Sequence, residues 1–392
     1  LCSTQQPIDV IKEQSVRKME GSSVVDICQY PYINETAENV LSIREDEVRR
    51  LFEHLQDADC LVLTAEGRSK AALRIGIGQI QKEVKTVEDI DFPGRNILVA
   101  APVLAERYNK ISLVINTSSG KTTTPTSIVH DLANYISKHN AKGQFSIDVV
   151  TSKPRSSIGR IGRKYGALLK LSGAKSKAEK TNRVLIRGIM NDVYELASMV
   201  LFQKIKEAIN DGRDYQWVIS EINREMTVVG RLIDDYVNSE MYQALAKSMS
   251  TRGHVTVGGG GPAKSVAEMT VIRLQHVKRA MGDQAYLTGG LAPKPRRGDC
   301  LLLVSWSGEN KPLIAWHKEY RATGADTFSV VGNKSALSES TQSIILESPV
   351  TKFYMRAAFL LSPLPLLLVA KLEKDGFGLP PEIMYWYHSS TE

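Results

Sequence analysis

Short apolar runs recur along the chain, and segments of helix length separate them. The strand-like runs of the first half are residues 60–64, 96–101, 111–115, 145–151 and 167–171. Those of the second half are residues 254–257, 285–288, 300–304, 327–331 and 343–346. Strands that alternate with helices favour a parallel sheet with helices on both faces. The pattern therefore predicts an α/β protein with a doubly wound parallel sheet in each half.

Helical spacing of apolar residues predicts the intervening helices. Residues 42–45 have the sequence of a capping box at the start of one helix. The strongest pattern covers residues 191–209, and one or two helices follow over 214–237. Other helices are expected at residues 71–85, 128–138, 240–250, 266–281, 313–320 and 352–371. The very apolar run 359–370 contains two prolines and is short for a bilayer. We interpret it as a buried helix or a helix-interface segment and expect no membrane partner.

The length of 392 residues predicts about two domains. With 42% hydrophobic and 24% charged residues, the chain can bury full cores. We expect an N-terminal arm over 1–41, a first domain over 42–210, connecting helices over 211–238, and a second domain with a C-terminal tail over 239–392.

The net charge of +7 favours an anionic partner, either a small phosphorylated ligand or nucleic acid, although a solvated basic surface would give the same value. Nucleic acid is not expected, because the basic run 160–164 has only Tyr165 as an aromatic neighbour.

The cysteines are Cys2, Cys28, Cys60 and Cys300. None forms a C-x-x-C pair, which argues against a zinc or redox motif and fits a reducing cytoplasm. Cys60 and Cys300 begin predicted strands, where buried thiols are common.

Two strand-like runs end abruptly in small hydroxyl residues. Residues 111–115 are followed, just before a predicted helix, by Ser118, Ser119, Gly120, Lys121 and Thr122. Short hydroxyls and backbone N–H groups at a helix start can surround a phosphate. Residues 300–304 end in the same way, in Ser305, Ser307, Gly308 and Glu309. This repetition suggests an internal duplication. A Walker A loop would need glycine where Ile115 stands, which argues against ATP.

In their order along the chain, these motifs resemble those of the sugar isomerase (SIS) domain family. The first-half matches are Gly67-Arg68-Ser69, Ser118-Ser119-Gly120-Lys121-Thr122, and residues 150–156, which include Ser152. The second-half matches are a run of four glycines that includes Gly259, then Ser265, Ser305-Trp306-Ser307-Gly308-Glu309 and residues 331–335. Within this family, the chain resembles 6-phospho-3-hexuloisomerases and two-domain phosphosugar isomerases. The resemblance implies two tandem domains, each a five-stranded parallel sheet between helices. It also implies sugar phosphates bound at the carboxyl ends of the strands, as open sheets favour.

The resemblance also implies a catalytic base. Glu195, in the run D-V-Y-E-L-A, is similar to the glutamate at a helix start that carries a proton between neighbouring carbons through an enediol(ate). Its residue type alone would fit an exposed glutamate that the helix dipole favours. The second half has Met355 at the matching position, so it lacks a base of its own. Lys121 and Arg68 are expected to stabilise negative charge.

The expected function is aldose–ketose isomerisation of a sugar phosphate, without a metal or organic cofactor. A non-catalytic sugar-phosphate-binding regulatory protein is the alternative, and amino-sugar chemistry is a third interpretation. We expect a cytoplasmic homo-oligomer, either a dimer or a tetramer. The sequence leaves open which sugar is bound, whether the second half takes a ligand, and which group opens the sugar ring.

Overall fold

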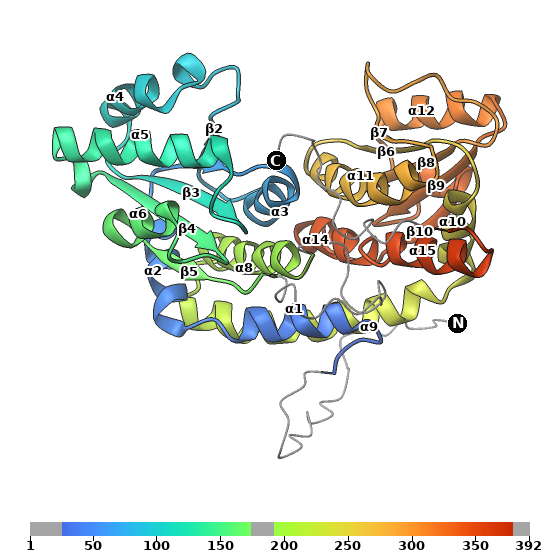
Figure 1. Ribbon diagram of the computed structural model, residues 1–392, viewed down its shortest axis with the longest axis horizontal. Coiled ribbons are helices and arrows are strands. Elements are labelled where there is room, and N and C mark those ends of the chain that lie inside the picture. Colours follow the sequence, from blue (N-terminus) through green and yellow to red (C-terminus); the bar gives the residue numbers. More distant parts are fainter. Residues whose placement is uncertain (1–25, 174–191, 379–392) are drawn as a thin grey trace, which may run out of the picture.

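The computed structural model describes residues 26–173 and 192–378, which contain two five-stranded parallel sheets (Figure 1). The first has the order β2-β1-β3-β4-β5, with strands Cys60–Thr64 (β1), Glu83–Thr86 (β2), Ile111–Thr117 (β3), Phe145–Thr151 (β4) and Leu168–Lys170 (β5). The second has the order β10-β9-β8-β6-β7, with strands Val255–Gly259 (β6), Ala285–Leu287 (β7), Cys300–Ser305 (β8), Asp326–Val331 (β9) and Gln342–Ile345 (β10). Read from its other edge, the second sheet has the topology of the first. The predicted fold class is confirmed.

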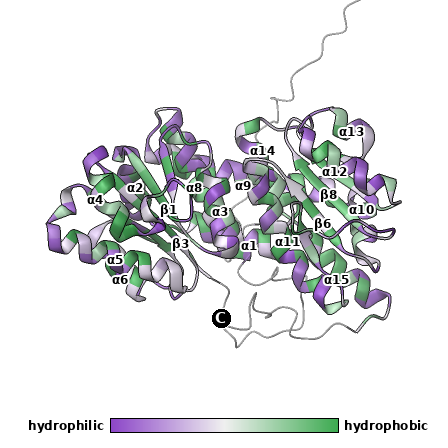
Figure 2. Ribbon diagram, turned by 90° about the horizontal axis from the view of Figure 1, so that it is seen from above, coloured by the Kyte–Doolittle hydropathy of each residue, from purple (hydrophilic) through white to green (hydrophobic). Residues whose placement is uncertain are grey.

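Helices cover both faces of each sheet. Those of the first half are Pro31–Leu41 (α1), Glu45–Asp57 (α2), Gly67–Ile77 (α3), Ile97–Arg107 (α4), Thr123–His139 (α5), Ser157–Tyr165 (α6), Asp192–Asn210 (α8) and Tyr215–Val237 (α9). Those of the second half are Glu240–Ser250 (α10), Pro262–Ala280 (α11), Lys311–Ala322 (α12), Ala336–Ser340 (α13), Val350–Leu360 (α14) and Leu364–Lys374 (α15). Apolar residues lie mainly on the strands and on the helix faces that are turned towards them (Figure 2).

The predicted strand at residues 96–101 is wrong, because this segment begins helix α4. Asn96 caps the helix, and its side-chain oxygen accepts a hydrogen bond from the backbone N–H of Leu98. The second strand is β2, which lies where the predicted helix 71–85 was expected to end. β2 lies at the sheet edge and carries exposed residues, so it has no apolar run. The segment resembled a strand because its exposed positions, Leu98 and Val99, are apolar like its buried ones, Ile97 and Ala100.

The predicted capping box at residues 42–45 is also wrong. Ser42 ends α1, and α2 begins after Arg44 without a side-chain cap. Acidic residues fill the first turn of α2, where the helix dipole favours negative charge. The described part of the predicted arm forms helix α1, whose Tyr32 and Ile33 are fully buried. The structure therefore includes this segment in the core.

The apolar segment near the C-terminus forms two helices, α14 and α15, instead of the one predicted over residues 352–371. Pro363 precedes α15. In length and composition the stretch Val350–Lys374 could cross a membrane, yet 78% of its most apolar window is buried inside the protein. It packs as an interior element, as the interpretation of residues 359–370 expected.

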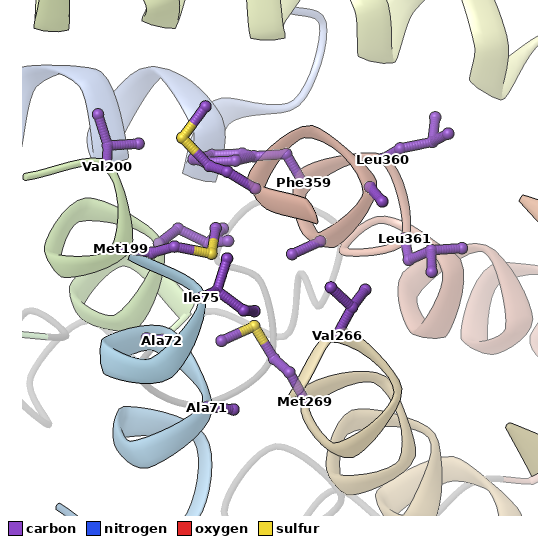
Figure 3. Packing of buried hydrophobic residues seen from close by; sticks show 14 of the residues in the cluster. Ala71, Ala72, Ile75, Met199, Val200, Val266, Met269, Phe359, Leu360 and Leu361 are labelled. Carbon is purple, nitrogen blue, oxygen red and sulfur yellow. The ribbon is translucent and has the colours of Figure 1, made fainter. Parts of the chain in front are cut away.

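One hydrophobic core joins the two halves (Figure 3). Helix α3 lies against α11 and α8, and α8 is buried along almost its whole length. The residues that meet there include Ala71, Ala72, Ile75, Met199, Val266, Met269 and Phe359. A β-carbon on Gly76 would lie 2.6 Å from Cβ of Phe202, so glycine allows α3 and α8 to approach this closely. Cys60 and Cys300 are buried free thiols in the two sheets, as predicted.

Candidate functional site

Three strands of the first sheet end side by side and bring their loops together. Thr64 of β1 pairs with Ile115, and Thr117 of β3 pairs with Thr151 of β4. Because the strands are parallel, the segments that follow β1, β3 and β4 leave the same edge of the sheet. In open α/β sheets ligands bind at this edge. The predicted first-half residues lie on these segments and on the start of α8.

The loop after β3, residues 118–122, is held by its own hydroxyls. The backbone N–H of Gly120 donates to Oγ1 of Thr117 at 3.2 Å, and that of Lys121 donates to Oγ of Ser119 at 3.2 Å. Thr122 is the N-cap of α5, but its side chain does not cap the helix. The hydroxyls of Ser119 and Thr122 are 3.4 Å apart, which is long for an O–H···O bond. The hydroxyls of Ser119 and Thr122 can therefore rotate and donate hydrogen bonds to an anion at the start of α5.

Glycine is required in this loop. Gly120 has φ 62°, and a β-carbon there would lie 2.5 Å from Oγ of Ser156 in the turn after β4. Ser152, in the same turn, donates to the carbonyl oxygen of Ser118 at 2.7 Å. The predicted phosphate-binding loop and the turn after β4 are therefore in direct contact, although Ser152 uses its hydroxyl to fix the loop. Lys121 is exposed.

The loop after β1 leads into α3, where Gly67, Arg68 and Ser69 form the first turn. Gly67 has φ 54°, a left-handed conformation that glycine adopts without strain. The side chain of Asn116, in β3, donates to the carbonyl oxygen of Ser69 at 2.9 Å and to Oγ of Ser198 at 3.0 Å. Asn116 thus fixes the start of α3 relative to β3 and α8.

Glu195 lies in the first turns of α8 and is only 4% exposed. Ser69 Oγ donates to its Oε1 at 3.4 Å, and Nη2 of Arg68 is 3.5 Å from its Oε2. Burial raises the pKa of Glu195 to about 7, although Arg68 lowers it in part. Asp192 acts in the same direction as burial, whereas Arg273 lowers the pKa. A carboxyl group with this pKa exchanges protons readily near neutral pH.

Asp192, one turn before Glu195, completes a group of buried charges. Its Oδ1 accepts hydrogen bonds from Nη1 of Arg68 and from Nε of Arg273, both at 2.7 Å. Sequence reasoning did not find Asp192, Arg273 or Asn116. The spacing of three residues from Glu195 was the available signal for Asp192, because it places both carboxylates on one helix face. Arg273 comes from α11 in the second half and has no such signal.

The second half repeats the geometry of the loop. The backbone N–H of Gly308 donates to Oγ of Ser305 at 3.1 Å, and that of Glu309 donates to Oγ of Ser307 at 3.3 Å. Gly308 has φ 66°, and a β-carbon there would clash with a serine hydroxyl, as at Gly120. The carboxylate of Glu309 accepts from the backbone N–H of Ala336 at 2.8 Å and so fixes the loop.

The other predicted second-half residues lie in positions where packing or a tight turn explains them. A β-carbon on Gly259 would lie 2.3 Å from the carbonyl oxygen of Ala263, so this glycine permits β6 to turn tightly into α11. Ser265 is buried in α11. Met355, at the position that matches Glu195, is buried in the core. Among the described residues, no group of three or more His, Cys, Asp or Glu side chains could hold a metal ion.

No protein-family model and no curated protein matches the sequence. Solved structures do match the fold. Tagatose-6-phosphate ketose/aldose isomerase from Escherichia coli aligns with a TM-score of 0.55 and 12% identity, over 92% of this chain and 96% of that one. The C-terminal domain of glucosamine-fructose-6-phosphate aminotransferase from Francisella tularensis aligns with a TM-score of 0.51 and 14% identity, over 90% of this chain and 98% of that one.

These likenesses confirm the fold that the sequence resemblance implied, in which two α/β units, each with a five-stranded parallel sheet, follow each other in one chain.

Proposed function

We propose that the first half is a sugar-phosphate aldose–ketose isomerase in which Glu195 carries the proton. The observation that supports this most is the buried carboxyl group of Glu195, whose pKa of about 7 is unusual for a glutamate. It lies beside Ser69 and Arg68, at the edge of the sheet where ligands of open α/β folds bind. The structural neighbour from Escherichia coli is named as a ketose/aldose isomerase of tagatose 6-phosphate.

The residues have distinct proposed roles. The hydroxyls of Ser119 and Thr122 and the N-terminus of α5 would hold the phosphate, with Lys121 adding positive charge from the loop. Ionised Glu195 would take the proton from the carbon next to the carbonyl and return it to the neighbouring carbon. In the same conversion the former carbonyl oxygen gains a proton and the neighbouring hydroxyl loses one, an exchange that water can carry. The negative charge that develops on the enediolate oxygen would be stabilised by Arg68, which lies beside the base.

The second half is proposed to support this site rather than to catalyse. It repeats the hydroxyl loop, but Met355 cannot carry a proton. The cytoplasmic location and the homo-oligomeric state stay predictions, as does the division of the chain at residues 42–210 and 239–392.

A sugar-phosphate-binding regulatory protein is the second candidate. The near-complete burial of Glu195 favours it, because a carboxylate that is held by Arg68 could serve the fold alone. Proton exchange separates the two functions. With fructose 6-phosphate, tagatose 6-phosphate or another ketose phosphate in D₂O, an isomerase places deuterium on the carbon next to the carbonyl. Glu195→Gln should abolish this signal and change ligand affinity only a few-fold.

Tight binding without exchange in the parent protein would show a regulatory protein instead. Retained exchange in the Glu195→Gln protein would place the base elsewhere, with Glu309 as the next residue to test. Unphosphorylated sugars serve as the control, because thermal shifts of equal size with and without the phosphate would exclude the proposed phosphate-binding loop.

A further inference from the structure

The second half contributes a charge to the first-half site. Arg273 lies on α11 and is fully buried. Its Nε donates to Oδ1 of Asp192 at 2.7 Å, and Nη1 of Arg68 donates to the same oxygen at the same distance. One carboxylate oxygen thus receives guanidinium groups from α3 and from α11, which face each other across the middle of the molecule (Figure 1).

Packing alone gives a poor explanation of Arg273. Its Nη1 and Nη2 atoms are buried and make no hydrogen bond to any residue that the structure describes. The neighbouring part of the α3–α11 contact is apolar, as Ala71, Val266 and Met269 show (Figure 3). An apolar side chain such as methionine would pack there without the cost of desolvating a cation. The positive charge of Arg273, and not its packing, therefore explains why an arginine stands at this position.

The geometry connects this charge to the base. Asp192 precedes Glu195 by one helical turn, and Arg68 touches both carboxylates, with Nη1 on Asp192 and Nη2 3.5 Å from Glu195. The groups that act on Glu195 come from three helices. They are Ser69 and Arg68 on α3, Asp192 on α8 itself, and Arg273 on α11.

We propose that Arg273 is a positioning residue of the first-half site, which through Asp192 holds Arg68 beside Glu195, so that one functional centre is built from both halves. This inference rests on the proposed function, because the role of Arg273 assumes that Glu195 acts as a base. The second half, which has Met355 in place of a base, supplies a cation to the base of the first half. The duplicated units are then complementary.

The test is the ionisation of Glu195 in three variants. Arg273→Met removes the cation, and Arg273→Lys keeps the charge. Asp192→Asn removes the anion. The titration is followed directly by NMR of ¹³C-labelled glutamate, with Glu195→Gln to assign the resonance. Arg356→Met is the control, because it removes a partly buried arginine that bridges two helices, in contact with Glu225.

Opposite shifts are expected from the two charges. Arg273→Met should raise the pKa of Glu195 by about one to two units, because a nearby cation is lost. Asp192→Asn should lower it, and both Arg273→Lys and Arg356→Met should leave it near the parent value. Proton exchange with the substrate at pH 7 should fall roughly five- to fifty-fold in Arg273→Met and recover at pH 9, since this shift only moves the ionisation.

Several outcomes would overturn the proposal. One is an unchanged titration of Glu195 in Arg273→Met together with a loss of exchange that is equal at all pH values, since this describes a structural residue. If Arg273→Met does not fold, Asp192→Asn decides, and a parent-like titration there refutes the coupling. Absence of exchange in the parent protein would refute the isomerase instead, while the carboxyl titration would still decide the role of Arg273.

Discussion

Replacement of Glu195 by glutamine is expected to stabilise the protein at alkaline pH and to leave its stability almost unchanged in acid. The reason is that burial raises the pKa of Glu195 from 4.5 to about 7. Below pH 4.5 the carboxyl group is protonated in both the folded and the unfolded protein. Between pH 4.5 and 7 the unfolded chain loses this proton while the folded protein keeps it, so folding becomes less favourable as the pH rises.

Above pH 7 the group is ionised in both states, and the folded protein carries the full cost of the buried charge. The shift from 4.5 to about 7 corresponds to about 3 kcal/mol of unfolding free energy. Glutamine never ionises and keeps nearly the same shape. Glu195→Gln should therefore match the parent at pH 4.5 and exceed it by about 3 kcal/mol at pH 8. Urea unfolding at both pH values, followed by circular dichroism, measures the difference.

Glu225 provides the reversed control. Burial alone would raise its pKa, but the cations of Lys204, Arg356 and Lys352 outweigh burial and lower it to about 2. Its stabilising effect is complete above pH 4.5 and is lost only as the pH falls towards 2. Glu225→Gln should thus cost about 3 kcal/mol at both pH 4.5 and pH 8. If the effect of Glu195→Gln is equally independent of pH, or if the variant is less stable at pH 8, the reasoning about the buried carboxyl group is wrong.

Three further substitutions test the loop and the core. Ser119→Ala and Thr122→Ala should each weaken sugar-phosphate binding by about 1.5–3 kcal/mol, measured by calorimetry, and parent-like affinity in both would place the phosphate elsewhere. Gly120→Ala introduces a methyl group 2.5 Å from a serine oxygen at a residue with positive φ, and it should weaken sugar-phosphate binding at least tenfold. Gly143→Ala is the control, because its methyl group meets open space, and this variant should bind as the parent does. Gly76→Ala places a methyl group 2.6 Å from the facing helix and should lower the unfolding free energy by about 1–3 kcal/mol; unchanged urea unfolding would show that α3 and α8 can separate.

The sequence predicted the elements that are buried on all sides. The central strands β1 and β8 are almost continuous apolar runs, and β3 is apolar over residues 113–115, because parallel strands are covered on both faces. The edge strand β2 has no such run and was missed, whereas residues 96–101 have one and form a helix. Apolar content alone does not separate a short helix from a strand.

The candidate site divides in the same way. The hydroxyl loop could be predicted because its residue types stand at fixed short spacings in the chain, whereas Glu195 was indicated only by the family resemblance. Arg273 could not be found, because its partner Asp192 is distant in the sequence and is reached only when α11 packs on α3. Sequence spacing predicts which residues are neighbours within one helix or loop. It does not predict a contact between the two halves, because that contact depends on how both halves pack.

The hydrophobic core that α3, α8 and α11 share has a consequence for how such a chain can change. Two units that had separate cores could exchange with related units or lose one partner and still fold. Here a substitution on α3 must suit a surface formed by the other unit, so the two halves must vary together. After a duplication, a junction of this kind would keep both copies in one protein even when their polar residues diverge.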